Sequence, residues 1–128
     1  MQAVNFHTLV LPSSPNYYLA CPQHYCNVKP NQISPTLSKP IAQVELKWQI
    51  FITQQPRVSL INSDPAHHQY FYVQRSLIFH FPDYITVKFI PLSAKQTSVA
   101  IFSQSKYGYS DLNVNKKRVI SWLQALSK

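Results

Sequence analysis

Apolar residues recur at helical spacing in two stretches of the chain. In residues 38–55, Pro40 suits the first turn of a helix, because its missing N–H would be unpaired there, and Pro56 stops the pattern. The apolar stripe of this stretch consists of Ile41, Val44, Trp48, Phe51 and Ile52. The stripe of the second stretch, which starts close to Asn115, consists of Val119, Trp122, Leu123 and Leu126. Two amphipathic helices are therefore predicted, with Trp48 as a core anchor of the first.

Four strand-like runs lie between the two predicted helices. They are residues 57–62, 67–81, 84–90 and 97–105. In the third run Ile85, Val87 and Phe89 alternate with more polar residues, which is typical of an antiparallel strand with one buried face. Since no helix separates the runs, the predicted fold is α+β, a single two-layer domain. Its four-stranded antiparallel sheet is expected to carry both helices on one face.

The first 38 residues follow neither pattern. Five prolines, at positions 12, 15, 22, 30 and 35, forbid a long helix there. Apolar residues such as Phe6, Leu9 and Leu19 nevertheless favour packing onto the domain over free motion. We therefore expect an irregular proline-rich arm, residues 1–38, packed against an α+β core, residues 39–128.

The charge balance favours anionic partners. Twelve Lys and Arg against four Asp and Glu give a formal net charge of +8, so an anionic small molecule is an electrostatically plausible ligand. Nucleic acid is disfavoured as a partner, because the cations are scattered except at 116–118 and form no basic stripe. No cofactor is indicated, and no stretch reaches the ~20 apolar residues of a membrane span. As given, the chain is expected to be soluble and cytoplasmic, or periplasmic if a leader was removed.

Two cysteines stand close together within the arm, in the segment Cys21-Pro-Gln-His-Tyr-Cys26. A metal site is disfavoured, because His24 and two thiolates supply only part of the four-ligand set that structural zinc requires. A redox couple prefers two intervening residues. Two interpretations stay open: a local disulfide in an oxidising compartment, or two structural thiols in a reducing one.

The segment 103–118, SQSKYGYSDLNVNKKR, holds the candidate site. Gly108, the single glycine of the protein, follows an apolar strand and predicts a turn with positive φ. The candidates for the N-cap of the following helix are Asp111, Asn113 and Asn115. The first turn of that helix carries three cations, residues 116–118, which oppose the helix dipole unless an anion or a carboxylate compensates them.

These motifs resemble those of DUF1499, a bacterial and plastid family of uncharacterised domains. The C-terminal signature of that family is close to S-x-S-x-x-G-Y-S-D-x-G-V-N-R-x-R. The chain matches it at Ser103, Ser105, Gly108, Tyr109, Ser110, Asp111, Val114, Asn115 and Arg118. Further similarities are Arg75-Ser76, Phe81 with Asp83, Pro15-Asn16, Tyr18-Leu19, Cys21-Pro22 and Cys26. The resemblance covers nearly the whole chain, and it implies no activity, because the family has none established.

Two positions depart from the family's signature. Asn113 stands where the family usually has glycine, and since Asn tolerates the left-handed conformation, the turn is expected to survive. Lys116 stands where the family usually has arginine. A bidentate contact between this position and an anion is therefore not expected.

Two functions compete on these grounds. In the first, the domain is a non-catalytic binding or accessory module with an anion or small-ligand site near the start of the C-terminal helix. The candidate residues are Arg75, Ser105, Lys106, Tyr109, Ser110, Asp111, Asn115, Lys116 and Arg118. In the alternative, the domain is an enzyme of unknown reaction that acts through the region of Arg75, Ser110 and Asp111. A structural interpretation stands beside both: Asp111 pairs with Arg75 or Arg118, Asn115 caps the helix, and the segment latches the fold.

Overall fold

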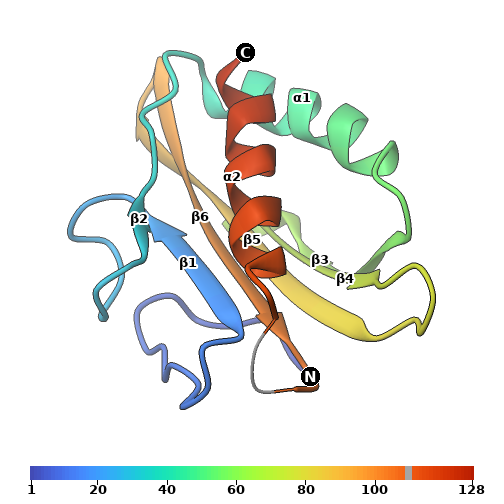
Figure 1. Cartoon of the computed structure of the whole chain (residues 1–128). Coiled ribbons are helices and arrows are strands. Elements are labelled where there is room, and N and C mark those ends of the chain that lie inside the picture. Colours follow the sequence, from blue (N-terminus) through green and yellow to red (C-terminus); the bar gives the residue numbers. More distant parts are fainter. Residues whose placement is uncertain (109–110) are drawn as a thin grey trace.

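Figure 1 shows the computed structural model of the chain, which describes residues 1–108 and 111–128. Two helices lie in front of a twisted sheet. Helix α1 spans Ile41–Thr53 and helix α2 spans Val114–Ser127. The strands are β1 Tyr17–Cys21, β2 Gln32–Ile33, β3 Val58–Asp64, β4 Gln69–Arg75, β5 Pro82–Ser93 and β6 Gln96–Ser105, and a short 3-10 helix covers Pro65–His67.

The sheet has six strands in the order β2-β1-β6-β5-β4-β3. Strands β3 to β6 form the antiparallel meander predicted from the sequence, and β1 joins it antiparallel to β6, with Leu19 opposite Phe102. Strand β2 pairs parallel to β1. The α+β class is confirmed, but the expected four-stranded antiparallel sheet is inexact, because the proline-rich segment contributes two strands. Its prolines forbid a helix, yet they flank β1 at positions 15 and 22 without interrupting the strand.

Both helices pack on one face of this sheet. Their buried residues join those of the strands in one apolar cluster, centred on Trp48 of α1, which is fully buried. The indole ring of Trp48 meets the rings of Tyr72, Phe89 and Trp122 edge to face, with centroids 5.5–6.1 Å apart. The predicted role of Trp48 as a core anchor is thus confirmed, since it joins α1, α2 and the sheet.

The N-terminal residues cover part of the opposite face. Phe6 and Leu9 pack with Leu19 and Phe102 in a second apolar cluster behind β1 and β6. This cover also reaches Thr86 of β5, which is 1% exposed and accepts a hydrogen bond at its Oγ1 from the backbone N–H of Val4. Strands β1, β6 and β5 are therefore buried on both faces over part of their length.

The two cysteines lie at the end of β1 and in the loop that follows it. The structure joins Cys21 to Cys26 by a disulfide, with the two Cα atoms 6.3 Å apart, a separation within the range of protein disulfides. Cys21 is fully buried in the second apolar cluster. Of the two interpretations that the sequence left open, this geometry supports the disulfide.

Removing the hydroxyl group of Tyr72 is expected to cost about 1–3 kcal/mol at neutral pH. The buried Trp48 indole N–H donates to that hydroxyl over 2.8 Å, so Tyr72→Phe leaves a buried donor without its partner. Burial also raises the pKa of Tyr72 from 10.0 to about 12, so the native state favours the neutral phenol. The neutral phenol of Tyr72 therefore contributes to stability fully below the ordinary tyrosine pKa of 10.0, and this contribution is lost as pH rises from about 10 through 12.

Urea denaturation at neutral pH and at about pH 11 tests this expectation. The difference in free energy of unfolding between the parent protein and Tyr72→Phe should be largest at neutral pH. It should become smaller in alkali, because only the parent carries a phenol at position 72 that can ionise. A difference that stays constant between the two pH values would show that Tyr72 ionises equally well in the folded and unfolded chains.

Candidate functional site

The chain enters helix α2 through a pair of left-handed residues, Leu112 and Asn113. Asn113 has φ 65° and ψ 20°, which confirms that asparagine maintains the turn where a glycine would otherwise be expected. Gly108 also has a positive φ, 86°, as its isolation in the sequence predicted. These backbone conformations bring Asp111 over the first turn of the helix.

Asn113, one of the three predicted candidates, is the N-cap residue of helix α2, and the side chain of Asp111 supplies the acceptors for the first N–H groups. The Oδ1 of Asp111 accepts a hydrogen bond from the N–H of Asn113 over 2.9 Å, and its Oδ2 accepts one from the N–H of Asn115 over 3.2 Å. A carboxylate at this end also opposes the positive charge of the helix dipole. The interpretation that Asp111 pairs with an arginine and Asn115 caps the helix is therefore wrong in both parts.

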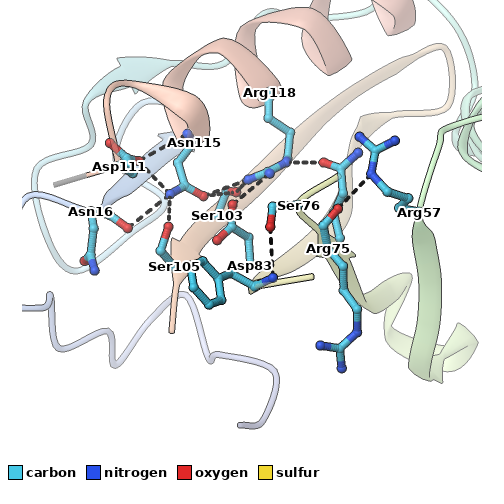
Figure 2. Close-up of polar contacts among 12 residues, drawn as sticks. Asn16, Arg57, Arg75, Ser76, Asp83, Ser103, Ser105, Asp111, Asn115 and Arg118 are labelled. Atoms are coloured by element: carbon cyan, nitrogen blue, oxygen red, sulfur yellow. Dashed lines mark hydrogen bonds and ion pairs between the residues drawn. The ribbon is translucent and has the colours of Figure 1, made fainter. Parts of the chain in front are cut away.

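Asn115 is the fully buried centre of a polar network (Figure 2). Its Nδ2 donates to the carbonyl of Asn16 over 3.1 Å, to Oγ of Ser105 over 2.9 Å and to Oδ2 of Asp111 over 2.6 Å. Its Oδ1 accepts a hydrogen bond from Oγ of Ser103 over 2.6 Å. One amide thus ties helix α2 to β6 and to the residue that precedes β1.

The guanidinium of Arg118 extends this network toward β4 and β5. Its Nη2 forms an ion pair with Asp83 over 2.8 Å, and its Nη1 donates to Ser103 Oγ and Asn115 Oδ1, each over 2.9 Å. Its Nε donates to Oε1 of Gln74. The side chains of Arg118 and Asp83 are only 8% and 14% exposed. Arg118 therefore holds four elements together, and its charge is largely neutralised by Asp83.

A cleft of about 530 Å³ opens beside this network, bordered by the ends of β4, β5 and β6 and by the start of α2. Three exposed cations line it: Arg57, Arg75 and Lys117. The Nε of Arg57 donates to the carbonyl of Arg75 over 2.9 Å, and Nη1 of Arg75 donates to the carbonyl of His80 over 3.0 Å. Figure 2 shows the Arg75 side chain running away from the Arg118 guanidinium. Within the described chain none of the three forms a salt bridge.

Each of the four acidic residues of the protein already has partners, although two of them, Asp83 and Asp111, also line the cleft. Asp83 pairs with Arg118, and Asp111 accepts hydrogen bonds at the start of α2. Glu45 accepts hydrogen bonds from Tyr70 and pairs with His68, and Asp64 pairs with His67. None of these four carboxylates forms a salt bridge with Arg57, Arg75 or Lys117 among the residues that the structure describes.

The other predicted site residues are dispersed. Lys116 lines a separate cavity of about 390 Å³ together with Tyr17 and Tyr18. Lys106 holds its Nζ 5.4 Å from the ring centroid of Tyr107, in a cation–π contact. Tyr109 and Ser110 lie outside the described residues. The structure thus brings Ser105, Asp111, Asn115 and Arg118 into one network and places Arg75 beside it at the cleft, whereas Lys106 and Lys116 belong to neither group.

Several residues of the network and cleft were absent from the predicted site. Asn16, Asp83 and Ser103 stand at positions that match the family motifs, and that match is a sequence signal that could have found them. Arg57 and Lys117 had no such signal. Arg57 precedes a strand as an isolated cation. Lys117 is the middle residue of the basic run 116–118, of which only Lys116 and Arg118 were predicted site residues.

The described residues offer neither a membrane-spanning helix nor a metal-binding cluster. In the described part of the chain, neither helix is long and apolar enough to cross a bilayer. Over the same residues, no group of three or more His, Cys, Asp and Glu side chains is placed to hold a metal ion.

Comparison with known proteins places the chain in a family without naming an activity. The model of the family described as "Protein of unknown function (DUF1499)" matches residues 10–126, nearly the whole chain. Neither a curated protein nor a solved structure matches this chain. Residues 10–126 include both helices up to Leu126, all six strands and every described residue of the polar network. The chain therefore belongs to the DUF1499 family.

Proposed function

We propose that this protein is a non-catalytic binding module whose cleft takes a small anionic molecule. The observation that carries the proposal is the group of three cations, Arg57, Arg75 and Lys117, that face one cleft without a carboxylate partner in the described chain. Unpaired cations that converge on a concave surface attract negatively charged ligands. A cavity of about 530 Å³ is in the size range of small-molecule sites.

The chemistry of the cleft suits a phosphate or a carboxylate group. Arginine presents a planar fork of donors that matches either anion, and Lys117 adds a point charge from the first turn of α2. Ser105 and Tyr107, which also line the cleft, supply hydroxyl groups. The proposed site differs from the one predicted from sequence, because Arg57 and Lys117 replace Lys106 and Lys116, and Arg118 serves mainly to hold the wall.

The enzyme alternative rests on Arg75, Ser110 and Asp111. Both carboxylate oxygens of Asp111 already accept hydrogen bonds from the first residues of α2, which favours a structural role for this group. Ser110 lies outside the described residues. The alternative stays a prediction, and no contact described above adds support to it.

Inorganic phosphate is expected to stabilise the folded protein. At ten times its dissociation constant, it should add about 1.4 kcal/mol to the free energy of unfolding and raise Tm by roughly 5 °C. The measurement is thermal unfolding in a phosphate titration at constant ionic strength. The double variant Arg75→Ala/Lys117→Ala should lose this rise while it stays folded, since both side chains are exposed.

The matched control is Lys39→Ala/Lys95→Ala, which also removes two positive charges, but at exposed positions outside the cleft. This control should keep the full rise in Tm. If phosphate stabilises neither the parent nor the control, or if both double variants lose the rise equally, the cleft is not the anion site.

A further inference from the structure

The hairpin between β4 and β5 presents apolar side chains to solvent. Leu77, Ile78, Phe79 and Phe81 are each 54–75% exposed, although large apolar residues normally lie inside a domain. The segment that holds them, residues 76–81, reads Ser-Leu-Ile-Phe-His-Phe. Figure 1 shows this loop, in yellow, projecting from the end of the β4–β5 hairpin. Contiguous exposed apolar residues of this kind mark interaction sites.

The loop is closed at its base by defined hydrogen bonds. The N–H of Ser76 donates to the carbonyl of Phe81 over 3.0 Å, and the N–H of Phe81 donates to Ser76 Oγ over 2.9 Å. The N–H of His80 donates to the carbonyl of Ser76 over 3.2 Å, and Nη1 of Arg75 donates to the carbonyl of His80. The tip residues 77–79 are thereby held outward by a preformed turn, and they are not a loose end of the chain.

An aromatic strip continues from the loop toward the cleft. The rings of Phe79 and Phe81 stack with centroids 5.5 Å apart, and Phe81 meets Tyr107 edge to face at 6.2 Å. Lys106 lies over the Tyr107 ring. Aromatic rings beside cations are typical of the interfacial layer of a bilayer, where the ring enters the boundary of the acyl chains and the cation meets phosphate.

Positive charges predominate around this strip. Arg75 stands at the base of the loop, Lys106 adjoins Tyr107, and Arg57 and Lys117 line the cleft that Phe81 and Tyr107 border. The acid nearest in the chain, Asp83, is neutralised by Arg118. Asp111, which also lines the cleft, accepts hydrogen bonds from the N–H groups at the start of α2. An anionic surface that met the loop would therefore meet four cations against this one carboxylate without a cationic partner, an excess of positive charge that is complementary to a lipid headgroup layer.

We propose that the loop 76–81 and these four cations form a docking surface for an anionic phospholipid bilayer. The apolar tip enters the headgroup and acyl boundary, and the cations contact lipid phosphates. This inference goes beyond the proposed function. It shares the cations Arg57, Arg75 and Lys117 with that proposal but rests in addition on the exposed apolar tip, whereas the first proposal concerns a soluble anion within the cleft.

Flotation with vesicles tests the proposal on the full chain. The protein should bind vesicles of equal parts phosphatidylcholine and phosphatidylglycerol, and it should bind vesicles of phosphatidylcholine at least ~100-fold more weakly, since each cation near an anionic surface contributes about fivefold. The variant Ile78→Ser/Phe79→Ser should bind the anionic vesicles more than ~10-fold more weakly than the parent, because the apolar tip is lost. Added salt should also weaken binding.

The matched control is Leu46→Ser/Ile50→Ser on α1, which removes two large apolar side chains that are 64% and 58% exposed. It should bind anionic vesicles as the parent does. Failure of the parent to bind, equal binding by Ile78→Ser/Phe79→Ser, or equal loss in the control would overturn the proposal. Sedimentation velocity without lipid adds a further test: an oligomer that the tip variant dissociates, together with no vesicle binding, would assign the tip to self-association.

The two proposals fail separately. The tip variant Ile78→Ser/Phe79→Ser should keep the rise in Tm that phosphate causes, because it leaves all three cleft cations in place. If the protein binds anionic vesicles but is not stabilised by phosphate, the proposal of a docking surface is supported and the proposal of a small-anion site in the cleft is rejected.

Discussion

Replacing Arg118 with alanine is expected to lower the free energy of unfolding by about 3–5 kcal/mol, the cost of breaking a buried ion pair from one side. The substitution leaves the Asp83 carboxylate in a poorly hydrated position and removes the donors that reach Gln74, Ser103 and Asn115. Chemical denaturation is the measurement. Because whole domains are stable by only about 5–15 kcal/mol, the midpoint should fall steeply, and the slope should stay unchanged.

Two companion variants interpret that result. Lys117→Ala, at the adjacent exposed position, should change stability by less than about 0.5 kcal/mol. Arg118→Lys should recover only part of the loss, since a single ammonium cannot reproduce a planar group that bonds through Nε, Nη1 and Nη2. An Arg118→Ala protein as stable as the parent would show that water satisfies Asp83 fully.

The isosteric change Asn115→Asp should lower the free energy of unfolding by a similar amount, roughly 3–5 kcal/mol, because a buried carboxylate replaces an amide. The amide Nδ2 now donates to the carbonyl of Asn16 and to Oδ2 of Asp111, so an oxygen in its place would face two acceptors, one of them charged. Shape is preserved and only the hydrogen-bonding sense and charge are altered. Urea denaturation again measures the loss.

Low pH offers a specific check on this cause. Burial and the neighbouring Asp111 raise the pKa of a carboxyl group introduced at 115, and Arg118, which contacts Oδ1 of residue 115 but already pairs with Asp83, offsets only part of this rise. Protonation on acidification should therefore restore part of the stability deficit relative to the parent. The matched control is Asn113→Asp, the same chemical change at an exposed residue whose left-handed backbone an aspartate tolerates. Asn113→Asp should leave the free energy of unfolding nearly unchanged. A deficit in Asn115→Asp that does not depend on pH would exclude the charge as its origin.

The elements predicted from sequence are those whose period is visible locally. Helices α1 and α2 carry apolar stripes, β5 alternates, β6 contains a continuous apolar run, and β3 is bounded by turn residues. Strand β1 was missed because both of its faces are covered, by the helices on one side and by Phe6 and Leu9 on the other. A strand buried on both faces loses the alternating pattern, and the five residues of β1 are too few to be distinguished from an arm that packs on the domain.

The candidate site was predicted in part, for a comparable reason. Asp111, Asn115 and Arg118 were identified together because they are close in the chain, but the partner of Arg118 is Asp83, 35 residues away, which only the sheet brings near. Lys116, which the sequence analysis named, and Lys117 line different cavities because of helix geometry. Successive helical residues point about 100° apart, so one of these lysines faces the cleft and the other the cavity beside Tyr17 and Tyr18.

The place of β1 in the sheet has a consequence for how the chain folds. Asn16, which precedes β1, bonds to the carbonyl of Gly108 and to the side chain of Asn115, contacts that span 92 and 99 residues. A polypeptide leaving the ribosome therefore carries β1 without its main neighbour until β6 has been synthesised, and the last helix closes over both. Such distant pairing has to overcome the entropy of closing nearly the whole chain into one loop. Compared with a helical domain of equal length, this protein is expected to fold slowly, with its N-terminal apolar residues exposed to chaperones until the C-terminus is complete.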